Sequence, residues 1–210
     1  MSPEYEKVID PLITSLLEIV QRADKMSIPD LTVELREEFD RANRQMETDR
    51  EWKYATYALV AWVDSEIIIN HNRWKDDTLE AHYFRTGNAY TEFFLRADKA
   101  YEKRYYNAFE VFYICFMFGY HGVYQTGDKT VVPKSLPLTD SEWQKKAAER
   151  ISRIRKSKKP EKWDETKLPD WSNQPLTGKS SFVNGLIFLT VVLLIASFAV
   201  FIVLSGNFGR

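Results

Sequence analysis

The stretch FEVFYICFMFGYHGVY, at residues 109–124, decides how this chain folds. Its first ten residues, 109–118, belong to a predicted helix from about Lys103 to Phe118 that is apolar on nearly every side. A helix of this kind is buried, so we expect it at the centre of the fold. Gly119 and Gly122 follow it, and glycine tolerates the positive φ angles that end helices. The stretch therefore predicts a central helix closed by a sharp reversal.

The preceding residues also show helical periodicity. Apolar residues spaced by three and four predict a helix over residues 5–24. Ser27 followed by Pro29 predicts the start of a second helix, and Asp49 predicts the cap of a third. The stripe of the first helix consists of Val8, Ile9, Leu12, Ile13, Leu16, Leu17 and Val20.

A broken, aromatic stretch follows at residues 70–87, and the residues around Phe93 and Phe94 predict a further helix. Residues 127–137 are expected to form a loop. Thr139 caps a last helix, with Glu142 three positions on as its capping-box partner. No segment shows a persuasive strand pattern, so residues 1–157 are predicted to form an all-α domain.

The C-terminal part carries a different signal. Residues 182–204 read FVNGLIFLTVVLLIASFAVFIVL, without a charged side chain. As a helix, these 23 residues span roughly 34 Å, enough to cross a bilayer core of about 30 Å. A buried core helix is the alternative, but it would need a polar face. We predict a juxtamembrane linker at 158–181, one transmembrane helix at 182–204 and a short periplasmic tail at 205–210.

Charge predicts the orientation of this span. Between Lys145 and Lys162 there are nine basic and two acidic residues, whereas the whole chain carries a net charge of −1. Basic residues beside a span favour the cytoplasmic side, and only Arg210 lies beyond it. The N-terminus lacks the apolar region of a signal peptide, and a single cysteine, Cys115, fits a reducing compartment. The N-terminal domain is therefore predicted to be cytoplasmic.

The basic run has two further interpretations. It can contact the anionic headgroups of membrane lipid. It can also bind nucleic acid, but the run lacks interleaved aromatic residues and the chain is slightly acidic, so we expect no nucleic-acid partner.

The inventory of chemical motifs argues against an enzyme. The chain has no phosphate-binding glycine loop, no GxSxG and no HExxH. Its three histidines are scattered, and Cys115 lies in an apolar helix where a thiol is inert. We predict no cofactor and no metal. Asp64 and Glu66 are favoured as structural groups, for example capping the loop at 70–73, over a membrane-bound enzyme that uses either carboxylate.

Two blocks of sequence resemble a known family. YALVAWVDSE at 57–66 is similar to the YALxAxxDE block of the DotU/TssL (IcmH) proteins of type VI and type IVb secretion systems. FEVFYICFMFGYHGVY at 109–124 resembles their LEVyyxCLxLGFxGxY block. Three further matches to the family pattern follow in the expected order. They are Trp74, the segment from Leu79 to Thr86, and Glu92 with the two phenylalanines after it. The C-terminal apolar tail completes the resemblance.

The chain also departs from the family pattern. Ser65 stands where the family commonly has Glu, and Tyr120 replaces the usual Phe. No peptidoglycan-binding extension follows the apolar tail, so we expect anchoring to the cell wall to come from partners.

The resemblance implies a hook-shaped cytoplasmic domain of two small helical bundles, held in the bacterial inner membrane by a single-pass tail. It implies a non-catalytic subunit that joins an IcmF/TssM-type membrane protein to baseplate proteins, and to an outer-membrane lipoprotein in type VI systems. A cleft between the bundles is the expected partner surface, near Asp64, Glu66, Trp74 and Glu80. The full set of partner-binding or signature residues is Tyr57, Asp64, Glu66, Trp74, Glu80, Glu110, Gly119, Gly122 and Tyr124.

We expect each signature residue to lie in the core of the domain rather than at an interface with a partner. Glu110 is expected to pair with a cation or to cap a neighbouring helix, and Tyr124 to bury its ring while its hydroxyl finds a partner.

Three alternatives stay open. A tail-anchored adaptor could bind a partner helix in a groove. The sequence does not distinguish a subunit of a type IVb system from a subunit of a type VI system. A homodimer is also open, because the span has no GxxxG pattern to predict helix pairing.

Overall fold

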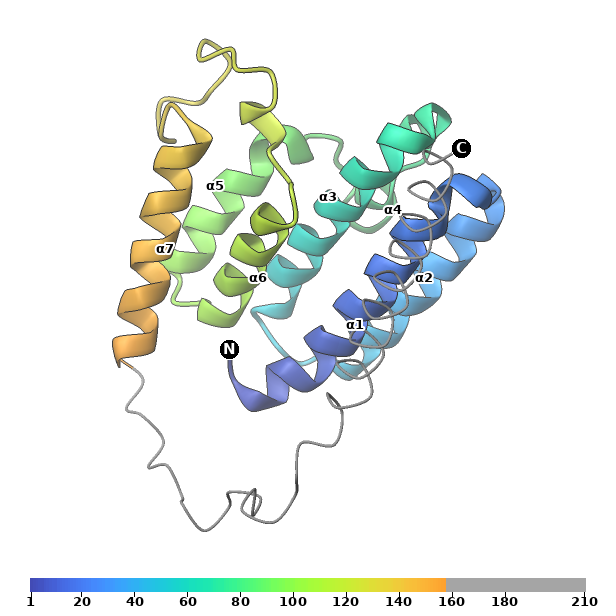
Figure 1. Cartoon of the computed structure of the whole chain (residues 1–210). Helices are drawn as coiled ribbons and strands as arrows, with labels where there is room; N and C mark the ends of the chain where they lie inside the picture. The colour runs from blue at the N-terminus through green and yellow to red at the C-terminus, as the bar shows by residue number, and fades with distance from the viewer. Residues whose placement is uncertain (158–210) are drawn as a thin grey trace, which may run out of the picture. The chain divides into compact units, whose positions relative to one another are not determined.

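The computed structural model of the chain describes residues 1–157, which form seven α-helices and three short 3-10 helices and contain no strand (Figure 1). The all-α prediction is confirmed for this part of the chain. The elements are α1 (Pro3–Arg22), η1 (Ala23–Lys25), α2 (Ile28–Gln45), α3 (Trp52–Asn70), η2 (Asn72–Asp76), α4 (Leu79–Phe84), α5 (Ala89–Glu102), α6 (Tyr106–Met117), η3 (Gly122–Tyr124) and α7 (Asp140–Ser157).

The predicted linker, transmembrane helix and periplasmic tail lie outside the described residues. Among the helices of residues 1–157, none combines the length and the apolar character that crossing a membrane requires.

Local capping signals place the helix starts. Ser27 Oγ accepts the backbone N–H of Asp30 at 3.3 Å, in the first turn of α2. Asp49 Oδ1 accepts the N–H groups of Glu51 and Trp52 at 2.6 and 3.1 Å. The N-cap position of α3 is Glu51 rather than the predicted Asp49, which supports the start of the helix from two residues earlier.

The predicted capping box of α7 is also present. Thr139 Oγ1 accepts the N–H of Glu142 at 3.2 Å. The Glu142 carboxylate reaches back to the N–H of Leu138 at 3.1 Å, one residue before the cap. Thr139 and Glu142 therefore each accept a backbone N–H that has no hydrogen-bond partner within the helix.

The helix predicted from Lys103 begins later, at Tyr106, because α5 runs on to Glu102. A tight reversal joins the two helices, and Arg104 adopts a positive φ of 61° within it. The Glu51 carboxylate then accepts the N–H groups of Asn107 and Ala108 at 2.9 and 3.2 Å. A side chain from the start of α3 thus supports the start of α6.

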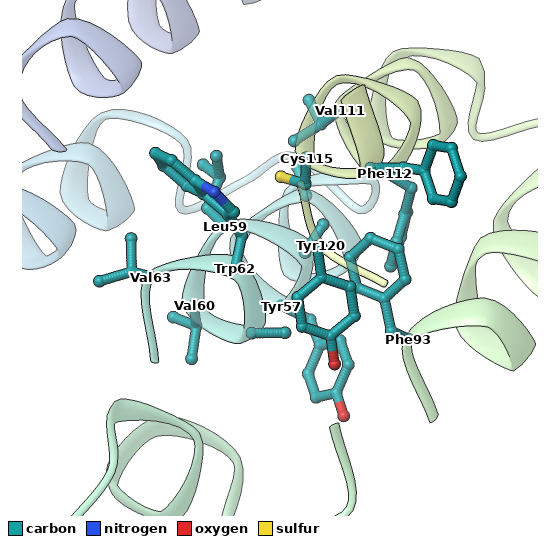
Figure 2. Packing of buried hydrophobic residues seen from close by; sticks show 14 of the residues in the cluster. Tyr57, Leu59, Val60, Trp62, Val63, Phe93, Val111, Phe112, Cys115 and Tyr120 are labelled. Carbon is teal, nitrogen blue, oxygen red and sulfur yellow. The ribbon is translucent and has the colours of Figure 1, made fainter. Parts of the chain in front are cut away.

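Two helices, rather than α6 alone, occupy the centre. Every residue of α3 from Ala55 to Asp64 is buried, and α3 contacts α1, α2, α4, α5 and α6. The outer end of α6 is more open than predicted, with Met117 54% and Phe118 40% exposed. Figure 2 shows the shared core, whose labelled side chains are Tyr57, Leu59, Val60, Trp62, Val63, Phe93, Val111, Phe112, Cys115 and Tyr120.

The N-terminus packs against α6. The backbone N–H of Ser2 donates to Asn107 Oδ1 at 2.8 Å. The ammonium group of Met1 forms an ion pair of 2.5 Å with the buried carboxylate of Glu110. The expectation that Glu110 pairs with a cation is confirmed, and the cation is the terminal amine.

The last described helix, α7, packs on α6 and α5. Its Trp143 ring lies 4.9 Å from that of Phe116 and 5.1 Å from that of Phe94. Lys146 and Arg150 both pair with Asp98 of α5. In Figure 1, α7 lies at the edge of the described part opposite α1 and α2.

Candidate functional site

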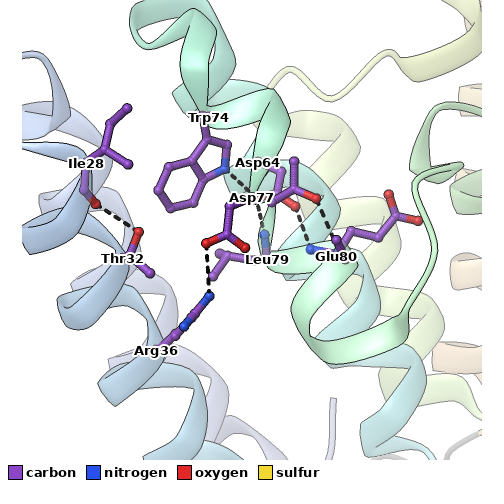
Figure 3. A network of polar contacts seen from close by, with 10 residues as sticks. Ile28, Thr32, Arg36, Asp64, Trp74, Asp77, Leu79 and Glu80 are labelled. Carbon is purple, nitrogen blue, oxygen red and sulfur yellow. Dashed lines mark hydrogen bonds and ion pairs between the residues drawn. The ribbon is translucent and has the colours of Figure 1, made fainter.

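Asp64 is the first of two buried carboxylates that organise the signature residues (Figure 3). It lies on α3 with 5% exposure. Its Oδ1 accepts Trp74 Nε1–H at 2.7 Å and the N–H of Leu79 at 2.9 Å, and its Oδ2 accepts the N–H of Glu80 at 2.8 Å. Asp64 therefore caps α4, whereas the sequence suggested a cap for residues 70–73.

Glu80 is the second carboxylate, 4% exposed in the first turn of α4. Its Oε1 accepts Tyr57 Oη–H at 2.9 Å, Thr86 Oγ1–H at 2.8 Å and the N–H of Asn88 at 3.1 Å. Its Oε2 accepts the N–H of Ala89, the first residue of α5, at 3.0 Å. Each carboxylate thus holds the start of the next helix, so α3, α4 and α5 are linked in series.

This pair of carboxylates and its donors, Asp64, Glu80, Tyr57 and Trp74, is named the carboxylate relay here. Burial raises the pKa of Asp64 to about 6, although its three N–H donors act in the opposite direction. Burial and the neighbouring Glu80 also raise the pKa of Tyr57, so its hydroxyl stays protonated and donates. Both carboxylates bind groups of the protein itself, which gives the relay a structural role.

Arg96 joins this buried relay to the surface. Its guanidinium carbon lies 3.8 Å from the centroid of the Tyr57 ring, and its Nε lies 3.3 Å from the Glu92 carboxylate. A surface hollow of about 470 Å³ opens beside it, lined by Lys53, Tyr54, Glu92, Leu95, Arg96 and Lys99. Arg96 was not among the residues predicted from the sequence, although its spacing of four from Glu92 on a predicted helix indicates an ion pair.

Glu66 does not join the relay. It is half-buried, and its burial raises its pKa. Its Oε1 lies 3.9 Å from the position that a Cβ on Gly119 would take, at the end of α6. The structure therefore separates Asp64 from Glu66, as their spacing of two on a helix predicts.

The two predicted glycine positions both have positive φ, of 104° at Gly119 and 43° at Gly122. A Cβ on Gly122 would lie 2.7 Å from the carbonyl oxygen of Tyr90, so only glycine fits at this close backbone approach. Tyr124 donates its hydroxyl to the carbonyl of Pro137 at 2.9 Å, which confirms the expected partner.

Most of the signature side chains are inside the folded chain. Tyr57, Asp64, Trp74, Glu80 and Glu110 are each 5% exposed or less. They support the elements around them, and their part in binding a partner stays a prediction.

A family model described as type VI secretion system protein DotU matches residues 5–206 of the chain. The chain belongs to the DotU family. This confirms the resemblance drawn from the two sequence blocks, and the match includes the apolar stretch at 182–204. The chain matches none of the curated proteins and none of the solved structures with which it was compared.

Membership of the DotU family makes the chain a component of a bacterial secretion system. Within residues 1–157, no group of three His, Cys, Asp or Glu side chains is arranged to hold a metal ion.

Proposed function

We propose that this DotU protein is a non-catalytic subunit of the inner-membrane complex of a type VI secretion system. It links an IcmF/TssM-type membrane protein to the cytoplasmic baseplate. The family match over residues 5–206 carries this proposal. A carboxylate relay used wholly for support is consistent with a scaffold, since neither of its acids is left free for chemistry.

The proposal includes an arrangement in the membrane. In this arrangement the apolar stretch at 182–204 is the anchor, and the basic residues before it support a cytoplasmic location for the helical domain. A hook-shaped outline of two bundles is a further expectation from the family, and a homodimer and service in a type IVb system are the alternatives that the sequence leaves open.

We place the partner surface at the hollow beside Arg96. Lys53 and Lys99 are exposed there, and Arg96 is half-buried, so cations outnumber the single carboxylate of Glu92. This charge suits an acidic segment of a partner protein. The relay supports the surface from below, because Tyr57 contacts both Glu80 and Arg96.

Deletion and co-purification test the function. Deleting the gene in its own bacterium should abolish export by the secretion system, and the tagged chain should co-purify with a large IcmF-like membrane protein. Normal export from a clean deletion would contradict the proposal.

Charge reversal tests the surface. Lys53→Glu with Lys99→Glu should weaken co-purification of one partner without unfolding the chain. Lys7→Glu with Lys25→Glu, also exposed, is the matched control of equal charge change and should bind normally. Equal binding by both double variants would contradict the assignment of the partner surface to this hollow.

A further inference from the structure

The last two turns of α7 carry a concentrated positive charge. Residues 150–157 contain four basic side chains and no acidic one. Arg150 pairs with Asp98, but Arg153, Arg155 and Lys156 are exposed and have no ion-pair partner among the residues that the structure describes. In sequence, Lys158 and Lys159 follow directly, and Lys162 comes after Pro160 and Glu161.

A groove of about 450 Å³ lies beside this charge, between α6 and α7. It is lined by Tyr113, Ala148, Ile151, Ser152, Arg155 and Lys156. Arg155 and Lys156 supply cations and Ser152 supplies a hydroxyl donor, which together suit a phosphate group. Tyr113 and Ile151 supply an apolar wall, which suits the glycerol and upper acyl region of a lipid.

The opposite edge of the described part has the reverse charge. Residues 1–45, which include α1 and α2, hold ten acidic and six basic residues. Figure 1 shows α7 and the α1–α2 pair at opposite edges. An anionic surface would therefore attract the end of α7 and repel α1 and α2.

We propose that this groove binds the headgroup of an anionic phospholipid and holds the end of α7 against the bilayer. Two observations select lipid as the occupant. The charge of the groove complements the anionic cytoplasmic leaflet, and the chain continues from this helix end toward the apolar stretch at 182–204. The inference rests on the membrane location in the proposed function, but it does not depend on any secretion partner.

Full-length protein in nanodiscs provides the test. A fluorophore on Ser157→Cys, at the end of α7, reports distance to phosphatidylcholine that carries a nitroxide on its headgroup. Val33→Cys on α2, 57% exposed, is the matched site at the acidic edge. The native Cys115 is fully buried and should not be labelled.

We expect quenching at residue 157 to rise several-fold when phosphatidylglycerol replaces part of the phosphatidylcholine, and quenching at residue 33 to stay low. Raising the salt concentration should reverse the effect. Equal quenching at residue 157 in neutral and anionic discs would overturn the proposal.

Charge variants distinguish binding at this groove from non-specific electrostatic attraction to the anionic bilayer. Arg153→Glu, Arg155→Glu and Lys156→Glu together should abolish the rise. The exposed set Lys7→Glu, Lys25→Glu and Lys75→Glu has the same change in net charge and should retain it. Loss in both sets, or in neither, would show that the groove has no specific role.

Competition identifies the source of the phosphate. Inorganic phosphate, compared with chloride at equal ionic strength, should not release residue 157 from the anionic disc. Release by phosphate alone, or by a short oligonucleotide alone, would assign the groove to that ligand and refute the lipid proposal. Failure of the chain to enter nanodiscs would instead contradict the membrane location in the proposed function.

Discussion

The hydroxyl of Tyr57 donates a 2.9 Å hydrogen bond to the carboxylate of Glu80, 23 positions further along the chain. Both side chains are buried, and both belong to segments that resemble the DotU pattern. The bond joins α3 to the first turn of α4, while the other oxygen of Glu80 holds the start of α5. These two residues of the family pattern thus stabilise the fold.

Breaking this bond should destabilise the domain from either side. Glu80→Gln replaces an acceptor by an amide N–H that faces the N–H of Ala89, so we expect a loss of about 2–3 kcal/mol in unfolding free energy. Tyr57→Phe should cost about 1–2 kcal/mol, because the hydrogen bond that the hydroxyl donates to Glu80 is lost. Chemical denaturation of the detergent-solubilised chain measures both. A double variant whose loss equals the sum of the two would contradict direct coupling.

The Asp64 carboxyl should titrate near pH 6, well above its ordinary value of 3.8. Between these values the folded state binds more protons than the unfolded state, so this group's contribution to stability falls as pH rises from about 4 to 6. Carbon-13 NMR of the carboxyl group gives the midpoint directly. Relative to Asp64→Asn, which lacks the titrating group, the native chain should lose about 1–3 kcal/mol over this interval. A midpoint near 4 would contradict the burial argument.

Gly122→Ala should be strongly destabilising, by about 2–4 kcal/mol, because φ is 43° and a Cβ would lie 2.7 Å from the carbonyl oxygen of Tyr90. Two other glycines separate these causes. Gly127 has φ of 68° but open space around it, so its alanine variant should lose only about 1 kcal/mol. Gly87 has neither constraint and should be neutral. Thermal unfolding of the three variants checks this order, and equal losses at residues 122 and 127 would exclude the steric cause.

Asp98 should control how firmly α7 is held. Asp98→Asn leaves Lys146 and Arg150 without their carboxylate, while the apolar contacts of Trp143 remain. Because these cations are partly buried, we expect a modest loss of about 1 kcal/mol, seen as faster amide exchange in α7. Asp76→Asn, at an exposed position, serves as the control and should leave the exchange of α7 unchanged.

Local signals were read correctly from the sequence, because their cause lies within a few residues. The caps at Ser27 and Thr139, and the support that Asp49 gives to the start of α3, depend on donors at most three positions away. The positive φ at Gly119 and Gly122 follows equally from what glycine alone permits.

The carboxylate relay could not be predicted in the same way. The donors to Asp64 lie 10, 15 and 16 positions further on, in a stretch that the sequence showed only as broken. Pairing over such distances is set by tertiary packing, and neither periodicity nor propensity carries that information. For the same reason, the sequence did not predict that α3 lies at the centre of the fold together with α6.

The hydrogen bond from Ser2 to Asn107 spans 105 positions, so the segment before α1 completes its contacts only when α6 is available. Contacts between distant parts of a chain form late, because a long loop must close first. A nascent chain would therefore hold α1 and α2 as an unfinished hairpin, with an apolar face in need of cover, until most of the domain had been made. Premature termination before residue 107 should leave a product prone to aggregation and open to proteases.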